Sequence, residues 1–287
     1  MNTLTMFMAI ILTLATPLVG GLLVGIDRKL TARMQERIGP PIIQPFYDVI
    51  KLWGKSPMIS NNLQPVLAFG YLGYAVIGAG MVAFRQDLLL VLFVMGVADV
   101  CLTVAALNAR SPYSYLGGRR EFLAILSYEP VMLLVYIAIF LVTGSFTIKG
   151  IYEYGRPLAL ILPLALLALE YVLVIEMKKS PYDVSGSGHA HQELVRGVFT
   201  EFSGYTMALV ELGHWTKLST TLMILSLFWA PNPLIGAAIS LTMFLLALIV
   251  DNIYPRLTWQ KMLRSTWGVG FTLVILNVTA LVLGGVI

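Results

Sequence analysis

The chain has 287 residues, of which 58% are hydrophobic and only 12% are charged. Soluble domains carry about 25% charged residues, so this composition excludes an ordinary soluble domain and places the chain in a bilayer. The single cysteine, Cys101, excludes an internal disulfide and any iron–sulfur or zinc site built on four cysteines. We therefore expect no cofactor and no metal in this chain, so redox chemistry would belong to partner subunits.

Eight segments are apolar over about 20 residues, the length that a helix needs to cross the hydrocarbon core. In chain order they are Thr5–Ile26, Pro65–Phe84, Leu88–Asn108, Phe122–Thr143, Pro157–Met177, Gly204–Ala230, Leu234–Ile253 and Trp267–Ile287. The sequence therefore predicts an all-α integral membrane protein with eight transmembrane helices and long cytoplasmic loops. Residues 1–287 are expected to form a single polytopic membrane domain.

The loops on the two sides of the predicted bundle differ in their basic residues. One side holds only Arg85, Lys149 and Arg156, whereas nearly all other Lys and Arg residues fall in loops on the opposite side. By the positive-inside rule the lysine- and arginine-rich side is cytoplasmic, which places both termini outside a cytoplasmic (inner) membrane. The net charge of +4 follows from this topology and calls for no nucleic-acid partner.

The predicted cytoplasmic loops are long and chemically dense. They cover Asp27–Asn62, Ala109–Glu121, Lys178–Ser203 and Asn252–Thr266. The first includes an amphipathic candidate, Pro45–Trp53, with Phe46, Val49, Ile50 and Trp53 on one face. Loops of this length seldom serve only as connections, so we expect cytoplasmic partners to dock on them.

Basic residues of the first loop have two readings. Arg28, Arg33 and Arg37 contact either a docked subunit or lipid headgroups. The Gly-Pro turn and the interleaved acids Asp27, Glu36 and Asp48 favour a shaped protein interface, because lipid headgroups would require only positive charge.

Ionisable side chains also lie inside the apolar segments. They are Asp99, Glu129, Glu170, Glu176, Glu211, His214 and Lys217. A charge at the centre of a bilayer costs about 2.5–3.5 kcal/mol on insertion scales, and such residues usually mark an ion or proton route.

Glu129 precedes Pro130, which has no N–H to donate to the carbonyl of Leu126. A freed carbonyl beside a carboxylate would form a polar pocket inside the helix. The alternative is a proline kink with Glu129 held by an arginine such as Arg120. In the fifth span, Glu170 lies too deep for its short side chain to reach the interface. Glu176 could join the same route or simply pair with Lys178 and Lys179.

Glu211, His214 and Lys217 follow one another at intervals of three residues and are expected to form one stripe on the sixth span. This stripe is either a static ion-pair network or a proton relay, because all three side chains are titratable. Asp99 pairs either with a basic group or with a partner subunit, and Asp251 is expected in a solvated position.

Motifs across nearly the whole chain resemble the NuoH family, the eight-helix subunit at the heel of respiratory complex I. They are Arg33-Met34-Gln35, Arg37-Ile38-Gly39-Pro40, Gln44-Pro45 with Asp48 and Lys51-Leu52, Leu116-Gly117, Ser127-Tyr128-Glu129, Ser180-Pro181-Tyr182-Asp183, Glu193-Leu194-Val195, Glu201-Phe202-Ser203-Gly204 and Pro255-Arg256-Leu257. The resemblance is strong because these motifs occur in order.

Two departures look like the membrane subunit of energy-converting (group 4, Ech-like) nickel–iron hydrogenases. The stretch Gly39–Gln44 is compressed relative to complex I members, near the quinone passage. Where complex I members have a carboxylate-rich run, this chain has Ser185–Glu193, which includes His189 and His191. These histidines fit polar loop filler at least as well as a ligand pair, since no third ligand is evident.

The resemblance implies a subunit that anchors a soluble redox arm and couples electron transfer to H⁺ or Na⁺ translocation. The implied partners are hydrogenase-like large and small subunits and an iron–sulfur subunit, which carry the iron–sulfur clusters and the nickel–iron centre, and antiporter-like membrane subunits. The predicted ion-route residues are Asp99, Glu129, Glu170, Glu176, Glu201, Glu211, His214 and Lys217. The predicted partner-interface residues are Asp27, Arg28, Arg33, Glu36, Arg37, Asp48, Arg120, Asp183, His189, His191 and Glu193.

Three other functions remain open at this stage. The first is the same fold in a quinone-reducing complex I, which a quinone-sized tunnel near Arg33 would favour. The second is a free-standing ion transporter, and the third is a passive anchor with no role in ion movement.

Overall fold

Helices carry the regular structure of the computed structural model, which describes residues 3–59, 61–182, 185–186 and 196–285. Within those residues there is no β-strand, only two isolated bridges. Six helices are long and apolar enough to cross a membrane: Thr5–Met34, Leu63–Ala83, Leu88–Leu107, Pro112–Thr143, Pro233–Ile253 and Trp259–Leu283. The all-α class is therefore confirmed, with six candidate spans.

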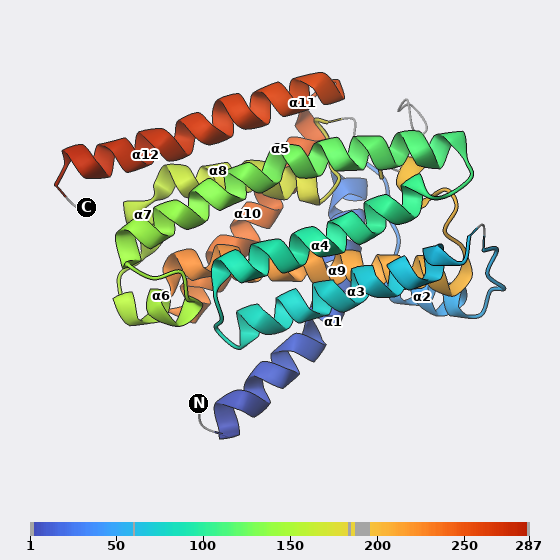
Figure 1. Ribbon diagram of the computed structural model, residues 1–287, viewed down its shortest axis with the longest axis horizontal. Coiled ribbons are helices and arrows are strands. Elements are labelled where there is room, and N and C mark those ends of the chain that lie inside the picture. Colours follow the sequence, from blue (N-terminus) through green and yellow to red (C-terminus); the bar gives the residue numbers. More distant parts are fainter. Residues whose placement is uncertain (1–2, 60, 183–184, 187–195, 286–287) are drawn as a thin grey trace.

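The elements follow one another with short connections except after α8. In chain order they are α1 (Thr3–Met34), α2 (Gln44–Trp53), α3 (Leu63–Ala83), α4 (Leu88–Leu107), α5 (Pro112–Thr143), α6 (Ile148–Tyr154), α7 (Leu158–Ile161), α8 (Pro163–Glu176), α9 (Gly204–Ser226), α10 (Pro233–Ile253), α11 (Trp259–Ser265) and α12 (Thr272–Leu283). The long helices run roughly alongside one another, while the N-terminal half of α1 projects from the bundle (Figure 1).

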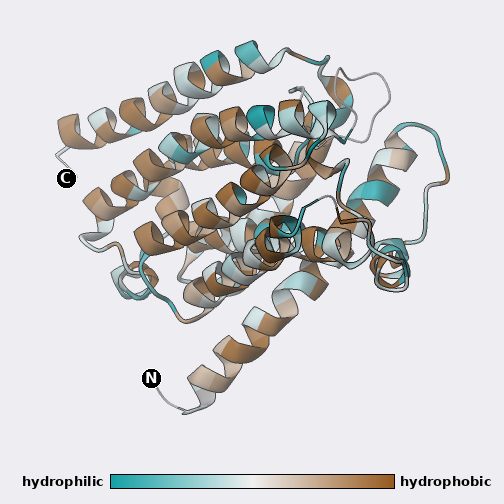
Figure 2. Ribbon diagram, turned by 45° about the vertical axis from the view of Figure 1, so that its right-hand side comes forward, coloured by the Kyte–Doolittle hydropathy of each residue, from teal (hydrophilic) through white to brown (hydrophobic). Residues whose placement is uncertain are grey.

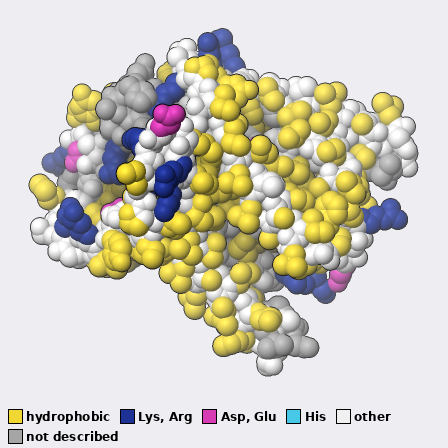
Figure 3. Space-filling view, turned by 180° about the vertical axis from the view of Figure 1, so that it is seen from behind, with side chains coloured by type: hydrophobic (Ala, Val, Ile, Leu, Met, Phe, Trp, Pro, Cys, Tyr) yellow, Lys and Arg dark blue, Asp and Glu magenta, His cyan; other side chains and the backbone are white. Residues whose placement is uncertain are grey.

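Hydrophobic residues dominate the long helices, and polar residues gather mainly toward one end of the bundle (Figure 2). Seen from behind, apolar side chains cover most of the surface, and many Lys and Arg side chains lie toward that same end (Figure 3). We call it the loop-bearing end; it comprises α2, the C-terminal part of α1, the N-terminal part of α5 and the connection between α8 and α9. The apolar surface between the ends matches a hydrocarbon environment.

Several helices extend further than the apolar segments predict. Asp27–Met34, expected in a loop, forms the last turns of α1, and Pro112–Glu121, also expected in a loop, opens α5. Asp27 and Arg28 stay helical beyond the apolar run because both have ion-pair partners, Lys179 and Asp48. Hydropathy marks where apolar residues stop, whereas a helix ends where its backbone groups lose their partners.

The predicted fifth span is broken in two. Leu162 leaves helical geometry between α7 and α8, and Pro163 opens α8. The side chain of Asn277 in α12 repairs the break, because its Oδ1 accepts from the N–H groups of Leu164 and Ala165 at 2.8 and 3.2 Å. Its Nδ2 donates to the carbonyl of Ile161 at 3.0 Å. Unpaired backbone groups are thus satisfied at a depth where water is scarce.

A second repair acts on α5, which continues through Pro130. The carbonyl of Leu126 is freed as predicted, but its partner is the indole N–H of Trp267, at 3.3 Å. Trp267 lies in a π-helical segment, Thr266–Phe271, that joins α11 to α12. The expected pocket of a free carbonyl beside Glu129 is therefore wrong.

Helix α9 lies in the interior, where most of its side chains are buried. It packs against α1 through very small residues: a Cβ at Gly20 would lie 2.0 Å from the carbonyl oxygen of Trp215. Ser219 Oγ also donates to the carbonyl of Thr16 in α1 at 2.8 Å. The close approach of these two helices depends on the missing side chain at position 20.

Gly20→Ala is expected to push α1 away from α9 and lower the free energy of unfolding by about 1–3 kcal/mol, as overpacking does. Thermal unfolding of the detergent-solubilised chain measures this loss. Gly73→Ala in α3 is the matched control, because a Cβ there meets nothing within 4 Å. Equal melting temperatures for the two variants would contradict the assigned packing.

Candidate functional site

A buried lysine holds two carboxylates together at the centre of the bundle. Lys217 Nζ in α9 lies 2.6 and 2.5 Å from the two carboxylate oxygens of Asp99 in α4. It also lies 3.3 Å from Glu176 Oε1 at the end of α8. All three side chains are at most 10% exposed, so one cation compensates acids from two other helices.

Neutral side chains complete this central cluster. Tyr128 of α5 donates its hydroxyl proton to Asp99 Oδ2 at 2.6 Å, and Thr221 donates to Glu176 Oε2 at 2.6 Å. The Lys217 ammonium also lies 5.8 Å from the centre of the Tyr128 ring. Each carboxylate therefore has a hydrogen-bond donor in addition to the shared cation, as buried charges require.

A second ion pair lies at the loop-bearing end. Lys178 Nζ is 2.8 Å from Glu121 Oε1 and 4.7 Å from the ring centre of Phe199. Ser185 donates a hydrogen bond to the other oxygen of Glu121. Lys178 has a φ of 55°, a left-handed conformation that is unfavourable for a residue with a side chain. The backbone accepts this cost where the chain leaves α8, and the lysine then turns inward.

A polar cavity of about 20 Å³ separates the two ion clusters. Its lining includes Glu121 and Lys178 on one side, Asp99, Glu176 and Lys217 on the other, and His214 between them. A cavity needs about 10–15 Å³ of this volume to hold one water molecule. A single water there would join the two clusters into a continuous polar path.

Glu129 lies against a further small cavity, of about 10 Å³. The lining also includes Asp99, Glu176 and Thr221, so this cavity adjoins the central cluster. Glu129 faces α4: a Cβ added at Gly96 would come within 2.5 Å of its Oε1. A glycine at position 96 leaves room for the carboxylate.

The three ionisable residues of α9 do not form one stripe. His214 and Lys217 share the polar cavity, but Glu211 lines a different pocket, together with Arg28, Asp48 and Arg196. At about 100° per residue, six positions rotate a side chain by about 240°, so Glu211 and Lys217 point in different directions. Spacing by three keeps neighbours together for one step but not for two.

The remaining predicted ion-route residues lie apart from the cluster. Glu170 has both carboxylate oxygens buried with no hydrogen-bond partner in the described part of the chain. Glu201 is half-buried before α9, where its carbonyl accepts from Gln64 of α3 at 2.8 Å. Glu170 lies one turn from the exposed Leu167, near the outer surface of the bundle.

The predicted partner-interface residues are split between fixed and exposed positions. Arg28 donates to Asp48 of α2 at 2.8 Å, whereas Arg33, Glu36 and Arg37 are exposed at the end of α1. Arg120 is half-buried in α5. Four further predicted residues, Asp183, His189, His191 and Glu193, lie outside the described residues.

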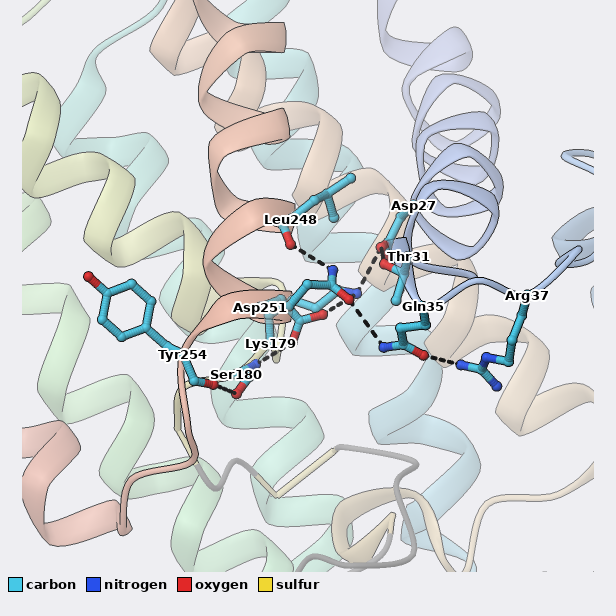
Figure 4. Close-up of polar contacts among 10 residues, drawn as sticks. Asp27, Thr31, Gln35, Arg37, Lys179, Ser180, Leu248, Asp251 and Tyr254 are labelled. Carbon is cyan, nitrogen blue, oxygen red and sulfur yellow. Dashed lines mark hydrogen bonds and ion pairs between the residues drawn. The ribbon is translucent and has the colours of Figure 1, made fainter. Parts of the chain in front are cut away.

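The polar contacts around Lys179 fasten the chain after α8 to two helices (Figure 4). Its Nζ donates to Asp27 of α1 at 2.8 Å and to Asp251 of α10 at 3.1 Å. Asp251 also accepts from the backbone N–H of Ser180 at 2.8 Å. Asp251 is therefore a buried structural acid, and the expectation of a solvated position is wrong.

Burial alone lowers the pKa of Lys179, but the carboxylates of Asp27 and Asp251 outweigh it and raise the pKa above the ordinary 10.5. For Asp48 burial raises the pKa, while hydrogen bonds from Arg28 and Gln44 act more strongly together and lower it below the ordinary 3.8. Both groups are therefore charged at neutral pH.

Sequence reasoning misses several members of the two clusters. It assigns Glu121 to the edge of a loop, and it expects Lys178 beside Glu176, which pairs instead with Lys217. The available signal is the position of Glu121 two turns before Glu129 in one helical register. The described residues contain no group of three or more His, Cys, Asp and Glu side chains placed to hold a metal ion.

The fold and the buried ions define a polytopic membrane protein with an ionisable interior. A family profile described as NADH dehydrogenase matches residues 6–282, so the chain belongs to this family, as its resemblance to NuoH indicated.

Two relatives and one solved structure refine the comparison. Hydrogenase-4 component C from Escherichia coli is 29% identical, with 92% of this chain and 91% of the relative covered. A membrane subunit of the NADH-quinone oxidoreductase from Rickettsia canadensis is 30% identical, with 67% and 63% covered. A chain of the membrane-bound sulfane sulfur reductase, an archaeal respiratory membrane complex, has the same fold, with 24% identity, a TM-score of 0.84, and 96% and 99% covered.

Asp99→Asn is expected to lower the free energy of unfolding by about 3–5 kcal/mol, because it weakens the compensation of a buried lysine. Lys217→Met should cost a similar amount, since it leaves two carboxylates without their cation. The double variant should lose less than the sum of the single losses, which unfolding in sodium dodecyl sulfate measures as a coupling energy. Additive losses would contradict the central ion pair.

Lys179→Met is expected to lower the free energy of unfolding by roughly 1–3 kcal/mol at pH 7. A raised lysine pKa contributes stability that is complete below 10.5, the unfolded value, and is lost as pH rises through the higher folded value. The difference between wild type and variant should therefore narrow only above pH 10.5. Lys261→Met, at an exposed position, is the control and should show no such difference.

Proposed function

We propose that this chain is the membrane subunit of an energy-converting hydrogenase complex, in which it anchors the soluble redox arm and couples electron transfer to ion movement. The similarity to hydrogenase-4 component C, which extends over 91% of that relative, supports this assignment. The NADH-quinone oxidoreductase relative is matched over only 63% of its length, so the quinone-reducing function is the second candidate.

The observation that carries the proposal is the polar path from Glu121 to Glu129. It passes from the Lys178–Glu121 pair through the cavity at His214 to Lys217, and then past Asp99 and Glu176 to Glu129. Such an arrangement of titratable groups and water-sized cavities inside a membrane protein suits proton or ion transfer. A passive anchor would have no need of a buried lysine with two acids.

Two further spans complete the proposed topology. Helix α9 has 23 residues and a buried course, and it falls outside the six apolar candidates, as expected for a span that carries Glu211, His214 and Lys217. The broken pair α7–α8 provides the other span, with its backbone repaired by Asn277. Eight spans place both termini outside the cytoplasmic membrane and the loop-bearing end in the cytoplasm.

The coupling step begins at the connection between α8 and α9 in this scheme. A redox event in soluble partners that carry iron–sulfur clusters and a nickel–iron centre moves this connection, and with it Lys178. When Lys178 withdraws from Glu121, a positive charge leaves one end of the polar path. A proton moving toward Glu121 restores the balance, and the change reaches Lys217 and Glu129 electrostatically.

The exit from the path leads sideways to a neighbouring antiporter-like subunit. Glu129 in α5 and Glu170 in α8 are the acids suited to this step. Glu170 lies near the surface and its carboxylate has no partner within the described residues, which fits a group that receives a proton from one side and releases it to another.

Glu129→Gln and Glu176→Gln are expected to reduce the number of ions transported per hydrogen evolved by about tenfold or more, because the amides cannot carry a proton through the path. Inverted membrane vesicles containing the whole complex allow both quantities to be measured together. Glu153→Gln is the matched control, since Glu153 is exposed outside the long helices and pairs with Lys149.

An unchanged ratio in both glutamine variants would favour the passive anchor. Ion transport by the purified chain without soluble partners would favour a free-standing transporter. Quinone reduction without hydrogen evolution by the purified complex would favour the second candidate.

A further inference from the structure

A larger pocket, separate from the polar path, opens among α1, α2 and α9. Its volume is about 210 Å³. The residues around it are Arg28, Pro45, Asp48, Val49, Lys51, Leu52, Lys55, Arg196, Met207, Glu211 and Trp215. It thus combines an apolar wall with basic side chains from three separate segments. In contrast to the cavity at His214, it has room for a group much larger than one water molecule.

The charges around this pocket do not cancel. Arg28 is paired with Asp48 at 2.8 Å, which leaves the cations Lys51, Lys55 and Arg196 against one acid, Glu211. No ion pair within 4.0 Å joins these three cations to an acid in the described part of the chain. The pocket is therefore electropositive and suited to an anion.

Trp215 provides an independent sign that a ligand belongs here. Its side chain is buried, and its ring meets Phe46 of α2 edge-on, with 5.3 Å between the ring centres. Its indole N–H has no hydrogen-bond partner among the described residues, although it lines the pocket. An unpaired buried donor costs about 1–3 kcal/mol, so an acceptor in the pocket would relieve a real penalty.

The location of the pocket indicates where the anion comes from. Helix α2 exposes Tyr47, Ile50 and Trp53, and such aromatic and apolar side chains on an amphipathic helix lie in the headgroup region of a bilayer. Pro45 and Val49 are buried against the bundle on the other side of α2. The pocket therefore lies at the boundary of bundle and membrane interface, where basic pockets between helices bind anionic headgroups.

We propose that this pocket binds the phosphate of an anionic phospholipid headgroup. Lys51, Lys55 and Arg196 neutralise the phosphate, and the indole N–H of Trp215 donates a hydrogen bond to the headgroup. The apolar wall of Val49, Leu52 and Met207 adjoins the glycerol backbone. A free phosphate offers the same charge but leaves that wall exposed to water, so the lipid fits the whole lining better.

Native mass spectrometry of the full-length chain tests the proposal, with phosphatidylglycerol, phosphatidylcholine and inorganic phosphate as probes. Wild type should bind phosphatidylglycerol more tightly than the zwitterionic phosphatidylcholine. Lys51→Gln with Arg196→Gln should weaken phosphatidylglycerol binding by about fivefold for each charge removed, or roughly 25-fold together. Lys261→Gln with Arg264→Gln removes two cations from the same end of the bundle, outside this pocket, and should leave the binding unchanged.

Trp215→Phe separates the hydrogen bond from the charges while it keeps an aromatic ring beside Phe46. It should weaken phosphatidylglycerol binding several-fold and should not lower the melting temperature of the lipid-free chain, because the unpaired donor is removed. A drop in stability with unchanged lipid binding would assign Trp215 to packing alone.

Three results would overturn the proposal. They are equal affinity for phosphatidylglycerol and phosphatidylcholine, displacement of the lipid by inorganic phosphate at similar concentration, and equal losses in the two double variants. If Lys51 and Lys55 were shielded from acetylation in a delipidated complex but not in the isolated chain, the occupant would be an acidic segment of a partner subunit.

Discussion

The ammonium of Lys217 is the contact on which the interior of this protein depends. It lies between acids of α4 and α8 while it is itself carried by α9, so three helices share one compensated group of charges. Buried ion groups are weak evidence for stability, because desolvation offsets most of the attraction. Their cost makes sense when the charges serve the chemistry, and here they lie midway between Glu121 and Glu129. Packing and proposed function thus depend on the same atoms.

Backbone repair by side chains is the second constraint of this fold. Asn277 joins the two halves of the broken span, and Trp267 occupies the carbonyl that Pro130 frees. Both side chains come from the C-terminal helical hairpin, which is wrapped against α5 and α8 in Figure 1. The C-terminal helices therefore do more than shield the core from lipid, since they allow two proline-containing helices to remain in a bilayer.

The sequence predicts most spans, because a long apolar run has few alternatives to a membrane helix. It also identifies nearly all the acids of the interior, since an ionisable residue among Leu and Val is conspicuous. It fails where geometry between helices decides the partner. Glu176 is expected beside Lys178, and only the tertiary packing shows that it contacts Lys217. Spacing on α9 likewise groups Glu211 with Lys217, because local periodicity cannot show which neighbour each side of a helix faces.

Helix lengths are the other weak point of prediction from sequence. Asp27 and Glu121 lie beyond the apolar runs of α1 and α5, but both remain helical because partners distant in the sequence compensate their charges. The family motifs, by contrast, require no geometry, and the family profile covers the same extent of the chain.

Lys178 and Lys179 are adjacent in sequence but make their contacts in opposite directions. One reaches Glu121 in α5, whereas the other reaches Asp27 in α1 and Asp251 in α10. The backbone between them therefore behaves like the pivot of a balance. A pull on the chain beyond residue 180 meets the firm triple contact of Lys179 first, so displacement turns into rotation about that point. The interior would then receive a change in orientation at Lys178, while the outer frame of α1 and α10 stays still.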